Sequence, residues 1–328
     1  MRRTLLPAAA SLPAIGLLLL TACGTERQGT ATGASPSAAQ DCGDGTATGT
    51  AGAGTGSPDG GEVVIVGTGT KPFAGRARPC ATYSVTNRGT EPLTYTVTLQ
   101  FLSAEMGTGL AMPQETVRDV APGRTVRRTV VPDDIHPDAE TEQVRAKVLT
   151  VRSVPVAEEP SRGGTCPPTG VRVYADDGDA AMGLRVVGLH LENCGTRPYR
   201  IEGHPRVEVL DEAHDRVDGV AVLKGGDAIA SGTGADGAPE RLVLAPGERA
   251  QAGLVWRNTV DGVTDGPVNA PYARVWAQPG AAPVMVTPEF DLGTTGKLGV
   301  GPWKKARKEQ KGSGAARPGG RQRDDSGT

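Results

Sequence analysis

The chain has 328 residues, with 47 Gly and 26 Pro, but aromatic residues make up only 3% of it. This composition argues against a single large helical or α/β enzyme, and a hydrophobic content of 37% is too high for a wholly disordered chain. The formal net charge of −2 gives no indication of a nucleic-acid partner, and we expect none.

Residues 1–22 are predicted to be a signal peptide. A basic start is followed by an apolar stretch at residues 5–20, which is shorter than the roughly 20 residues of a membrane span. Residues 20–23, LTAC, resemble the lipobox of bacterial lipoproteins, with Cys23 as the lipidated residue. The alternative is an ordinary secretory signal. We expect a lipid-anchored protein on the extracytoplasmic face of the cell membrane.

Both ends of the mature chain are predicted to be disordered. Residues 24–61 contain no large aliphatic or aromatic side chain, so 23–61 is interpreted as the lipidated Cys plus a flexible tether. Residues 304–328 carry eight Lys or Arg against three acidic residues and form a predicted basic tail. A solvated tail is favoured over an arm that binds anionic wall polymer or lipid.

The segment between these ends, residues 62–303, is predicted to be all-β. Short runs of β-branched residues, such as 95–101, 144–151 and 184–191, alternate with Gly, Pro and Asn turns, and helical periodicity is nearly absent. This pattern is typical of antiparallel β-sandwiches. A linker at 158–164 divides the segment into two predicted sandwich domains, 62–157 and 165–303.

A repeated pair of turns supports two tandem domains. NRGTEP at 87–92 recurs as NCGTRP at 193–198, and VAPGR at 120–124 recurs as LAPGE at 244–248. Asn and Gly tolerate left-handed backbone, and Pro-Gly suits a type II turn. The order of the turns predicts two copies of one Ig-like plan, with residues 224–240 as an inserted loop in the second.

Four cysteines remain once Cys23 is assigned to lipid, which is an even number in an oxidising location. They allow three pairings, of which we prefer Cys166 with Cys194 and Cys42 with Cys80. Zinc is disfavoured because the closely spaced ligand pairs of zinc sites are absent from the sequence.

The second half resembles a known family in the motifs CPP at 166–168, NCGTRPY at 193–199, GHPRVEVLD at 203–211 and APG at 245–247. In this order they resemble domain of unknown function 4232, common in actinobacterial lipoproteins and secreted proteins, over about 165–288. The resemblance implies a β-sandwich without an assigned activity. His204 stands where the family usually has Tyr, and Cys194 follows the Asn directly, whereas many members place it later. The first half resembles generic bacterial Ig-like domains.

The sequence offers no catalytic constellation. GTGADG at 232–237 matches the dinucleotide fingerprint, but it lies in a polar loop instead of between a strand and a helix. The four histidines share no metal-ligand spacing, and His204 is expected to replace an aromatic residue beside Pro205. We therefore predict no catalytic residue, no cofactor and no enzyme activity.

Acidic and aromatic groups give the remaining candidate sites. The acidic stretches 133–140 and 176–179 are interpreted as turn formers, so no metal site is predicted. Trp256, Tyr272 and Trp276 are candidate ligand-binding residues that would form a sugar-stacking platform. The alternative, which we favour, is that these aromatics fill the core of their strands.

Taken together, these features predict a non-enzymatic, lipid-anchored surface protein. We expect a binding or adhesion module for an envelope ligand, either a protein or a wall glycan. The alternative is an accessory lipoprotein that scaffolds an envelope complex.

Overall fold

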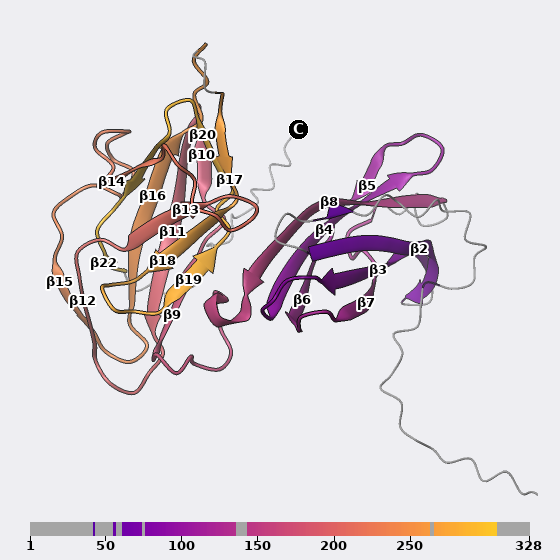
Figure 1. Cartoon of the computed structure of the whole chain (residues 1–328), viewed down its shortest axis with the longest axis horizontal. Coiled ribbons are helices and arrows are strands. Elements are labelled where there is room, and N and C mark those ends of the chain that lie inside the picture. The colour runs from indigo at the N-terminus through magenta and orange to yellow at the C-terminus, as the bar shows by residue number, and fades with distance from the viewer. Residues whose placement is uncertain are drawn as a thin grey trace, which may run out of the picture. The chain divides into compact units, whose positions relative to one another are not determined.

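The computed structural model of the chain describes residues 42, 55–56, 61–73, 76–135, 143–262 and 266–306. The predicted signal peptide, Cys23, most of the predicted tether and residues 307–328 lie outside the described residues. The described part consists of β-strands and one short 3-10 helix, η2 (Val156–Glu158), as the predicted all-β class requires (Figure 1). The described residues form one compact unit that contains two large hydrophobic cores.

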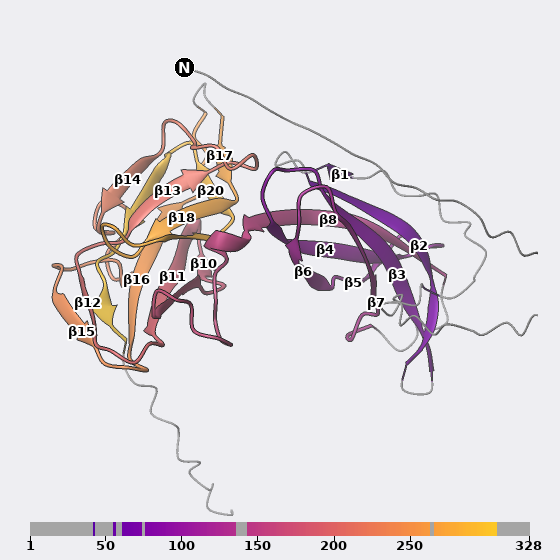
Figure 2. The ribbon, with the colours of Figure 1, turned by 60° about the horizontal axis from the view of Figure 1, so that its bottom comes forward.

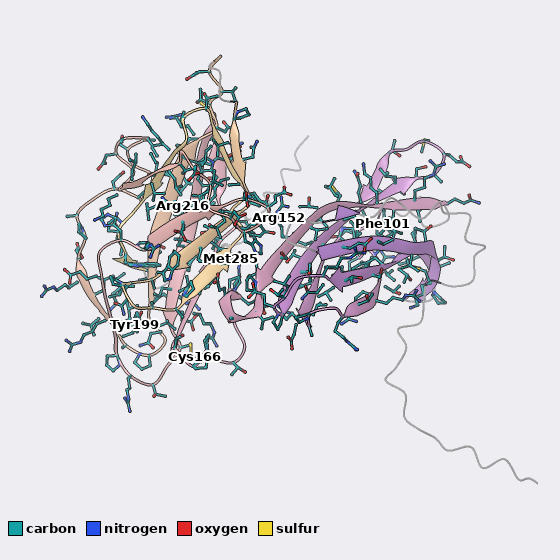
Figure 3. All side chains as sticks on the ribbon, viewed as in Figure 1. Phe101, Arg152, Cys166, Tyr199, Arg216 and Met285 are labelled. Atoms are coloured by element: carbon teal, nitrogen blue, oxygen red, sulfur yellow. A yellow bond between two sulfur atoms is a disulfide. The ribbon has the colours of Figure 1, made fainter. Side chains whose placement is uncertain are left out.

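The first core lies between two four-stranded sheets. Along the central strand of one sheet, Tyr95, Val97, Leu99 and Phe101 are buried and alternate with partly exposed residues, as the two-residue period of a strand dictates (Figure 3). The first sheet has the order β1 (Thr55–Gly56), β2 (Gly61–Phe73), β3 (Arg76–Asn87), β7 (Thr125–Val130). In the second, β4 (Leu93–Ser103) pairs with β5 (Gly109–Ala111), β6 (Gln114–Val120) and β8 (Val144–Pro155).

The second core lies between a seven-stranded sheet and three smaller ladders (Figure 2). The large sheet contains β9 (Val171–Ala175), β10 (Asp179–Ala181), β11 (Leu184–Asn193), β14 (Ala221–Lys224), β16 (Arg249–Arg257), β21 (Lys297–Val300) and β22 (Lys304–Lys305). The smaller ladders are β12 (Tyr199–Glu202) with β15 (Arg241–Leu244), β13 (Arg206–Leu210) with β18 (Tyr272–Trp276) and β19 (Pro283–Val286), and β17 (Val268–Ala270) with β20 (Phe290–Gly293). All described pairs of strands are antiparallel except β14 with β21.

The limits of the sandwiches differ from the prediction at both ends. Lys304 and Lys305, assigned to the tail, form β22 against β16, and the amide of Ala306 donates to the Arg249 carbonyl. Within the predicted tether, β1 pairs with β2, and the Cys42 amide donates to the Thr82 hydroxyl at 3.0 Å. Composition misses these contacts because backbone pairing at a sheet edge requires no apolar side chain.

The repeated turns share one hydrogen-bond network in each sandwich. In the first, the Asn87 amide nitrogen donates to the carbonyls of Glu91 and Val120 at 2.8 and 2.7 Å, and its amide oxygen accepts from Gly89. The Asn87 backbone exchanges hydrogen bonds with Gly123 and Arg124 of the Pro-Gly turn. This single buried side chain therefore ties the two turns together.

Asn193 makes the same contacts in the second sandwich. Its side chain donates to the carbonyls of Arg197 and Leu244, both at 2.8 Å, and accepts from Gly195. Its backbone exchanges bonds with Gly247 and Glu248. The pairing of the flanking strands repeats as well, because β3 pairs with β7 as β11 does with β16, and β4 pairs with β6 as β12 does with β15. The predicted internal repeat is therefore present in the topology.

The predicted left-handed backbone of the recurring turn residues is found in the Pro-Gly turns but not at the Asn positions. The Pro-Gly turns have Gly123 and Gly247 at φ of 71° and 81°, which favours glycine. Asn87 and Asn193, in contrast, are absent from the positive-φ residues, so the expectation of left-handed Asn is wrong. Asn is suited to this position because it both donates and accepts hydrogen bonds.

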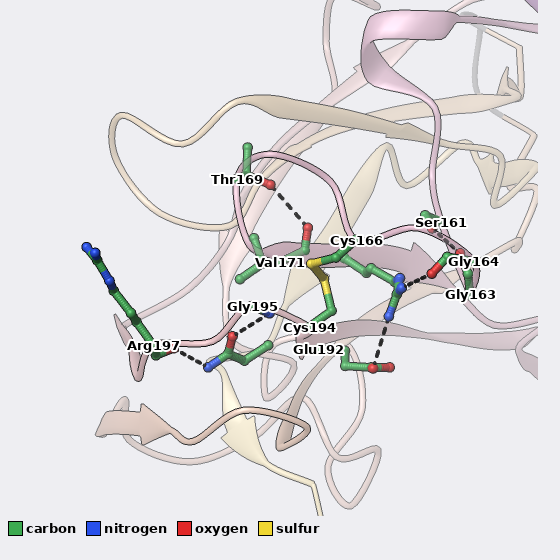
Figure 4. The surroundings of a disulfide bond; sticks show 12 residues. Ser161, Gly163, Gly164, Cys166, Thr169, Val171, Glu192, Cys194, Gly195 and Arg197 are labelled. Atoms are coloured by element: carbon green, nitrogen blue, oxygen red, sulfur yellow. Dashed lines mark hydrogen bonds and ion pairs between the residues drawn. A yellow bond between two sulfur atoms is a disulfide. The ribbon is translucent and has the colours of Figure 1, made fainter.

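The two preferred cysteine pairings are both formed. Cys42 and Cys80 have Cα atoms 5.9 Å apart, and Cys166 and Cys194 have theirs 5.6 Å apart. The second disulfide lies directly beside the Asn193 turn (Figure 4). It joins the segment before β9 to the residue after β11, so the end of this antiparallel pair at Val171 and Asn193 is closed covalently.

The predicted inserted loop, residues 224–240, is fixed to the neighbouring strands at several points: the Gly225 amide donates to the Val300 carbonyl, and Lys304 Nζ donates to the Gly234 carbonyl. Ala235 is fully buried, and a Cβ atom added to Gly301 would lie 2.7 Å from its Cα atom. The GTGADG segment is part of this loop between β14 and β15, without the strand and helix that a dinucleotide site needs.

Residues from both sandwiches also meet in a small third cluster, formed by Val154 of β8 with Leu210, Tyr272 and Met285. Beside it, Arg152 binds Glu289 through two nitrogen–oxygen contacts of 2.5 and 2.7 Å (Figure 3). The cluster and the bidentate ion pair connect the end of the first sandwich to the second.

Replacing Asn193 by Ala should destabilise the second sandwich by about 2–4 kcal/mol, because two buried carbonyls and one amide would lose their partner. All three Trp of the chain lie in this sandwich, so Trp fluorescence during urea unfolding reports on it selectively. The exposed neighbour Arg197→Ala is the control and should leave the midpoint nearly unchanged. Equal midpoints for Asn193→Ala and the wild type would contradict the prediction.

Candidate functional site

A groove of about 580 Å³ in the second sandwich is the strongest candidate for a binding site. Its volume lies within the range of small-molecule sites. It is lined by the start of β13, by β14, by the end of β18 and by the loop that follows β18. The lining residues are His204, Pro205, Arg206, Val207, Val222, Leu223, Lys224, Trp276, Gln278, Pro279, Gly280, Ala281 and Val300.

An arginine stacked on a tryptophan forms one wall of this groove. Arg206 of β13 and Trp276 of β18 are direct partners in the antiparallel ladder. The guanidinium carbon of Arg206 lies 4.2 Å from the centroid of the indole ring, a cation–π contact that orients the guanidinium. One guanidinium nitrogen also lies 3.4 Å from a Glu208 carboxylate oxygen. Arg206 is largely exposed, so this ion pair is weak.

Two further basic side chains line the groove from other segments. His204 precedes β13, and Lys224 ends β14. The pKa of His204 is lowered from its ordinary value, first by burial and then by the positive charge of Lys224. The two groups are therefore close enough for mutual repulsion, and acidification favours the unfolded chain, in which His204 protonates more readily.

Trp303 holds the two segments that carry the groove. It is fully buried, its indole nitrogen donates to the Ala277 carbonyl at 2.8 Å, and its backbone amide donates to the Gly203 carbonyl at 2.9 Å. Ala277 follows Trp276, and Gly203 precedes His204. The last buried aromatic of the sandwich therefore fixes both sides of the groove.

The aromatic platform is not formed, and the alternative that we favoured, burial of these aromatics, is confirmed for Trp256 and Tyr272. Trp256 and Tyr272 are each only 1% exposed. The Trp256 indole donates to Asp291 at 2.7 Å, and the Tyr272 hydroxyl accepts from the Ser153 amide at 2.9 Å. Only Trp276 of the three is partly exposed. Strand alternation turns Trp256 inward on the same face of β16 as Ala252 and Leu254, whereas Tyr272 is buried in the cluster with Val154, Leu210 and Met285.

A second hollow, of about 390 Å³, contains a carboxylate–imidazole pair. Asp176 lies 2.8 Å from the Nε2 atom of His190 and also accepts from the amides of Gly178 and Gly188. Although burial opposes it, the combined hydrogen bonds and the charge of His190 lower the Asp176 pKa. The hydroxyl in the lining, that of Thr233, donates to the Ala230 carbonyl. The carboxylate thus orients the imidazole and closes the turn before β10.

Within the described residues, no group of three or more His, Cys, Asp or Glu is arranged to hold a metal ion. Part of the acidic stretch 133–140, namely 136–140, lies outside the described residues. The described part also contains no helix of the length and apolar character needed to cross a bilayer.

The comparison with protein families agrees with the resemblance seen in the second half. Residues 166–304 match the family described as Domain of unknown function (DUF4232). The match contains the Asn193 network, the Cys166–Cys194 disulfide and the whole groove. No curated protein matches the chain.

The sequence did not reveal Arg206, Lys224 or Trp303 as parts of a site. The position of Arg206 beside Trp276 depends on the register of two strands 66 residues apart along the chain. Lys224 lies in the segment that we interpreted as an inserted loop. A basic residue directly after the Gly-His-Pro step was the one local signal that was available.

Replacing Lys224 by Met should raise the pKa of His204, because the repulsive charge is lost while most of the burial remains. The measurement is an NMR titration of the imidazole resonances in the full chain. Lys297→Met is the control, since Lys297 lies on neighbouring β21 but does not contribute to the His204 shift. A His204 pKa that responds equally to both variants would contradict the assignment.

Proposed function

We propose that the protein is a non-enzymatic, lipid-anchored surface protein whose second sandwich binds a component of the cell envelope. The observation that carries the proposal is the groove, which combines a small-molecule volume, apolar walls and a few convergent polar groups. A site of this size can receive part of a wall glycan or of a protein, the two ligand classes predicted from the sequence.

The two disulfides support an extracytoplasmic location. Disulfides persist in secreted and surface proteins, whereas reducing systems keep cytosolic thiols free. The LTAC motif at 20–23 supports an anchor at Cys23. The family matched at 166–304 supports the same location, because the resemblance to it implies a lipoprotein or a secreted protein.

The arrangement of polar groups supports binding over catalysis. In the groove, the reactive group is His204, and the lining contains no Ser, Thr, Cys, Asp or Glu to act with it. In the hollow beside β10, the Asp176–His190 pair has a hydroxyl neighbour that is hydrogen-bonded to a carbonyl. We therefore assign the polar groups of the groove to ligand recognition and the Asp176–His190 pair to turn structure.

The junction between the sandwiches favours the second candidate function, an accessory scaffold. The apolar cluster around Tyr272, the bidentate Arg152–Glu289 pair and the 2.8 Å Arg274–Glu158 contact would hold a scaffold's two domains together. A scaffold of this kind would retain its partner when the groove is altered, whereas a groove binder would not.

Replacing Trp276 by Ala should reduce the retention of the envelope component at least about tenfold, because one wall is lost and Arg206 is released. Immobilised full chain is exposed to separate protein, glycan and lipid fractions of the envelope, and the bound material is quantified. The control is Val243→Ala, which removes an exposed apolar side chain from β15. Retention that is unchanged by Trp276→Ala favours the scaffold, and retention of nothing contradicts both functions.

Replacing Cys23 by Ala should move the protein from the membrane fraction to the soluble fraction, because the diacylglyceryl anchor would have no attachment site. Quantitative immunoblotting of fractionated cells measures the change. Thr25→Ala, just beyond the LTAC motif, is the control and should stay with the membrane. A Cys23→Ala protein that remains in the membrane fraction would overturn the lipid anchor.

A further inference from the structure

The charges that line the groove differ from those of the domain around it. Residues 166–304 contain 18 acidic and 13 Lys or Arg side chains, so the matched domain is acidic on balance. The lining of the groove nevertheless contains Arg206, Lys224 and His204 and no acidic residue. The groove is thus lined by basic groups although the domain as a whole is acidic, which indicates an anionic ligand.

The Trp276 ring fixes the strongest of these anion-binding groups. The guanidinium carbon of Arg206 lies 4.2 Å from the centroid of the Trp276 ring. The N–H groups of this stacked guanidinium point outward from the edge of the guanidinium plane. Its one carboxylate contact, to Glu208 at 3.4 Å, is exposed and involves one of its nitrogens. The remaining donors can bind two oxygens of a phosphate or carboxylate at once.

The same contact argues against a stacked sugar as the ligand. A sugar platform presents a bare aromatic face, and here the guanidinium of Arg206 already lies over that of Trp276. Recognition by charge therefore replaces recognition by ring stacking at this position.

The shape of the basic cluster favours phosphate over carboxylate. Arg206, Lys224 and His204 come from β13, from the end of β14 and from the segment before β13. Donors that approach from several directions match the tetrahedral oxygens of a phosphate, whereas a carboxylate offers two oxygens in one plane.

The rest of the lining is apolar. Val222 is 43% exposed, and Leu223, Ala281 and Val300 also contribute to the walls. An inorganic anion would leave these side chains in contact with water, whereas an apolar group attached to the anion would cover them.

We infer that the groove binds an amphiphilic phosphate ester, with the phosphate held by Arg206, Lys224 and His204 and the apolar group packed on Val222 and Leu223. The inference rests on the proposed function, an envelope ligand bound in this groove, and replaces the two ligand classes predicted from the sequence by a phosphate ester. The required ligand consists of one phosphate group joined to an aliphatic moiety small enough for about 580 Å³.

The test uses the full chain and the soluble short-chain lipid dihexanoyl phosphatidic acid in isothermal titration calorimetry. We expect saturable binding of one ligand per chain, weakened about tenfold by Arg206→Gln and by Lys224→Met. The matched controls are Arg200→Gln on β12 and Lys297→Met on β21, which are exposed and absent from the groove lining and should keep wild-type affinity. Trp fluorescence during urea unfolding verifies that each variant is folded.

Two competitor ligands examine the two halves of the inference. Equal affinity for hexanoate would overturn the preference for phosphate, and equal affinity for inorganic phosphate would overturn the role of the apolar walls. Absence of binding by the folded wild type, or equal loss of affinity in the control variants, would overturn the inference as a whole.

A vesicle experiment identifies the source of the ligand. Phosphatidylcholine vesicles that contain phosphatidic acid either displace the short-chain lipid, which supports a ligand presented by a bilayer, or leave it bound, which supports a free amphiphile. The proposed function fails independently of this inference. If envelope material is retained through Trp276 and the phosphate ester does not bind, the function stands and the ligand class is wrong. If the ester binds and no envelope fraction is retained, the ligand class stands and the proposed function is wrong.

Discussion

A buried asparagine that is hydrogen-bonded to two turns determines the arrangement of each sandwich. Asn87 and Asn193 each satisfy two carbonyls and one amide that would otherwise be buried without partners. Because one turn leads into a strand of one sheet and the other leads back into the facing sheet, the asparagine fixes how the two layers connect. The strand pairing around it is the same in both halves.

The second sandwich differs from the first in the elements added to this common plan. The loop after β14 is fastened to the large sheet through Ala235, and β14 itself adds in parallel to β21. These additions bring Lys224 to the side of the molecule where Arg206 and Trp276 face each other in the β13–β18 ladder. Trp303, at the end of the sandwich, ties the segments before β13 and after β18. The groove thus depends on β14, which has no counterpart among the described strands of the first sandwich.

The disulfides, the Tyr272 cluster and Trp303 keep the proposed binding surface rigid. Disulfides fasten the start of each sandwich to a central strand or turn, and the Tyr272 cluster joins the end of the first sandwich to the second. A groove whose Arg206 is already stacked and whose walls are anchored by Trp303 loses little conformational entropy when a ligand binds. Such preorganisation suits the proposed binding role.

The fold class and the repeat were predictable from the sequence because they depend on local signals. Alternating β-branched residues specify strands, and Pro-Gly specifies a turn whichever strands it connects. The groove was not predictable, because Arg206 and Trp276 meet only through the register of β13 with β18, and Lys224 arrives from an insertion. Strand alternation likewise decided that Trp256 points into the core. Tyr272 and Trp276 lie four residues apart on one face of β18, and packing with Val154 of the first sandwich buries Tyr272 while Trp276 borders the groove. Sequence alone determined the strands, the turns and the preferred cysteine pairs. Tertiary structure decided which side chains face one another, since a shift of one residue in register exchanges the two faces of a strand.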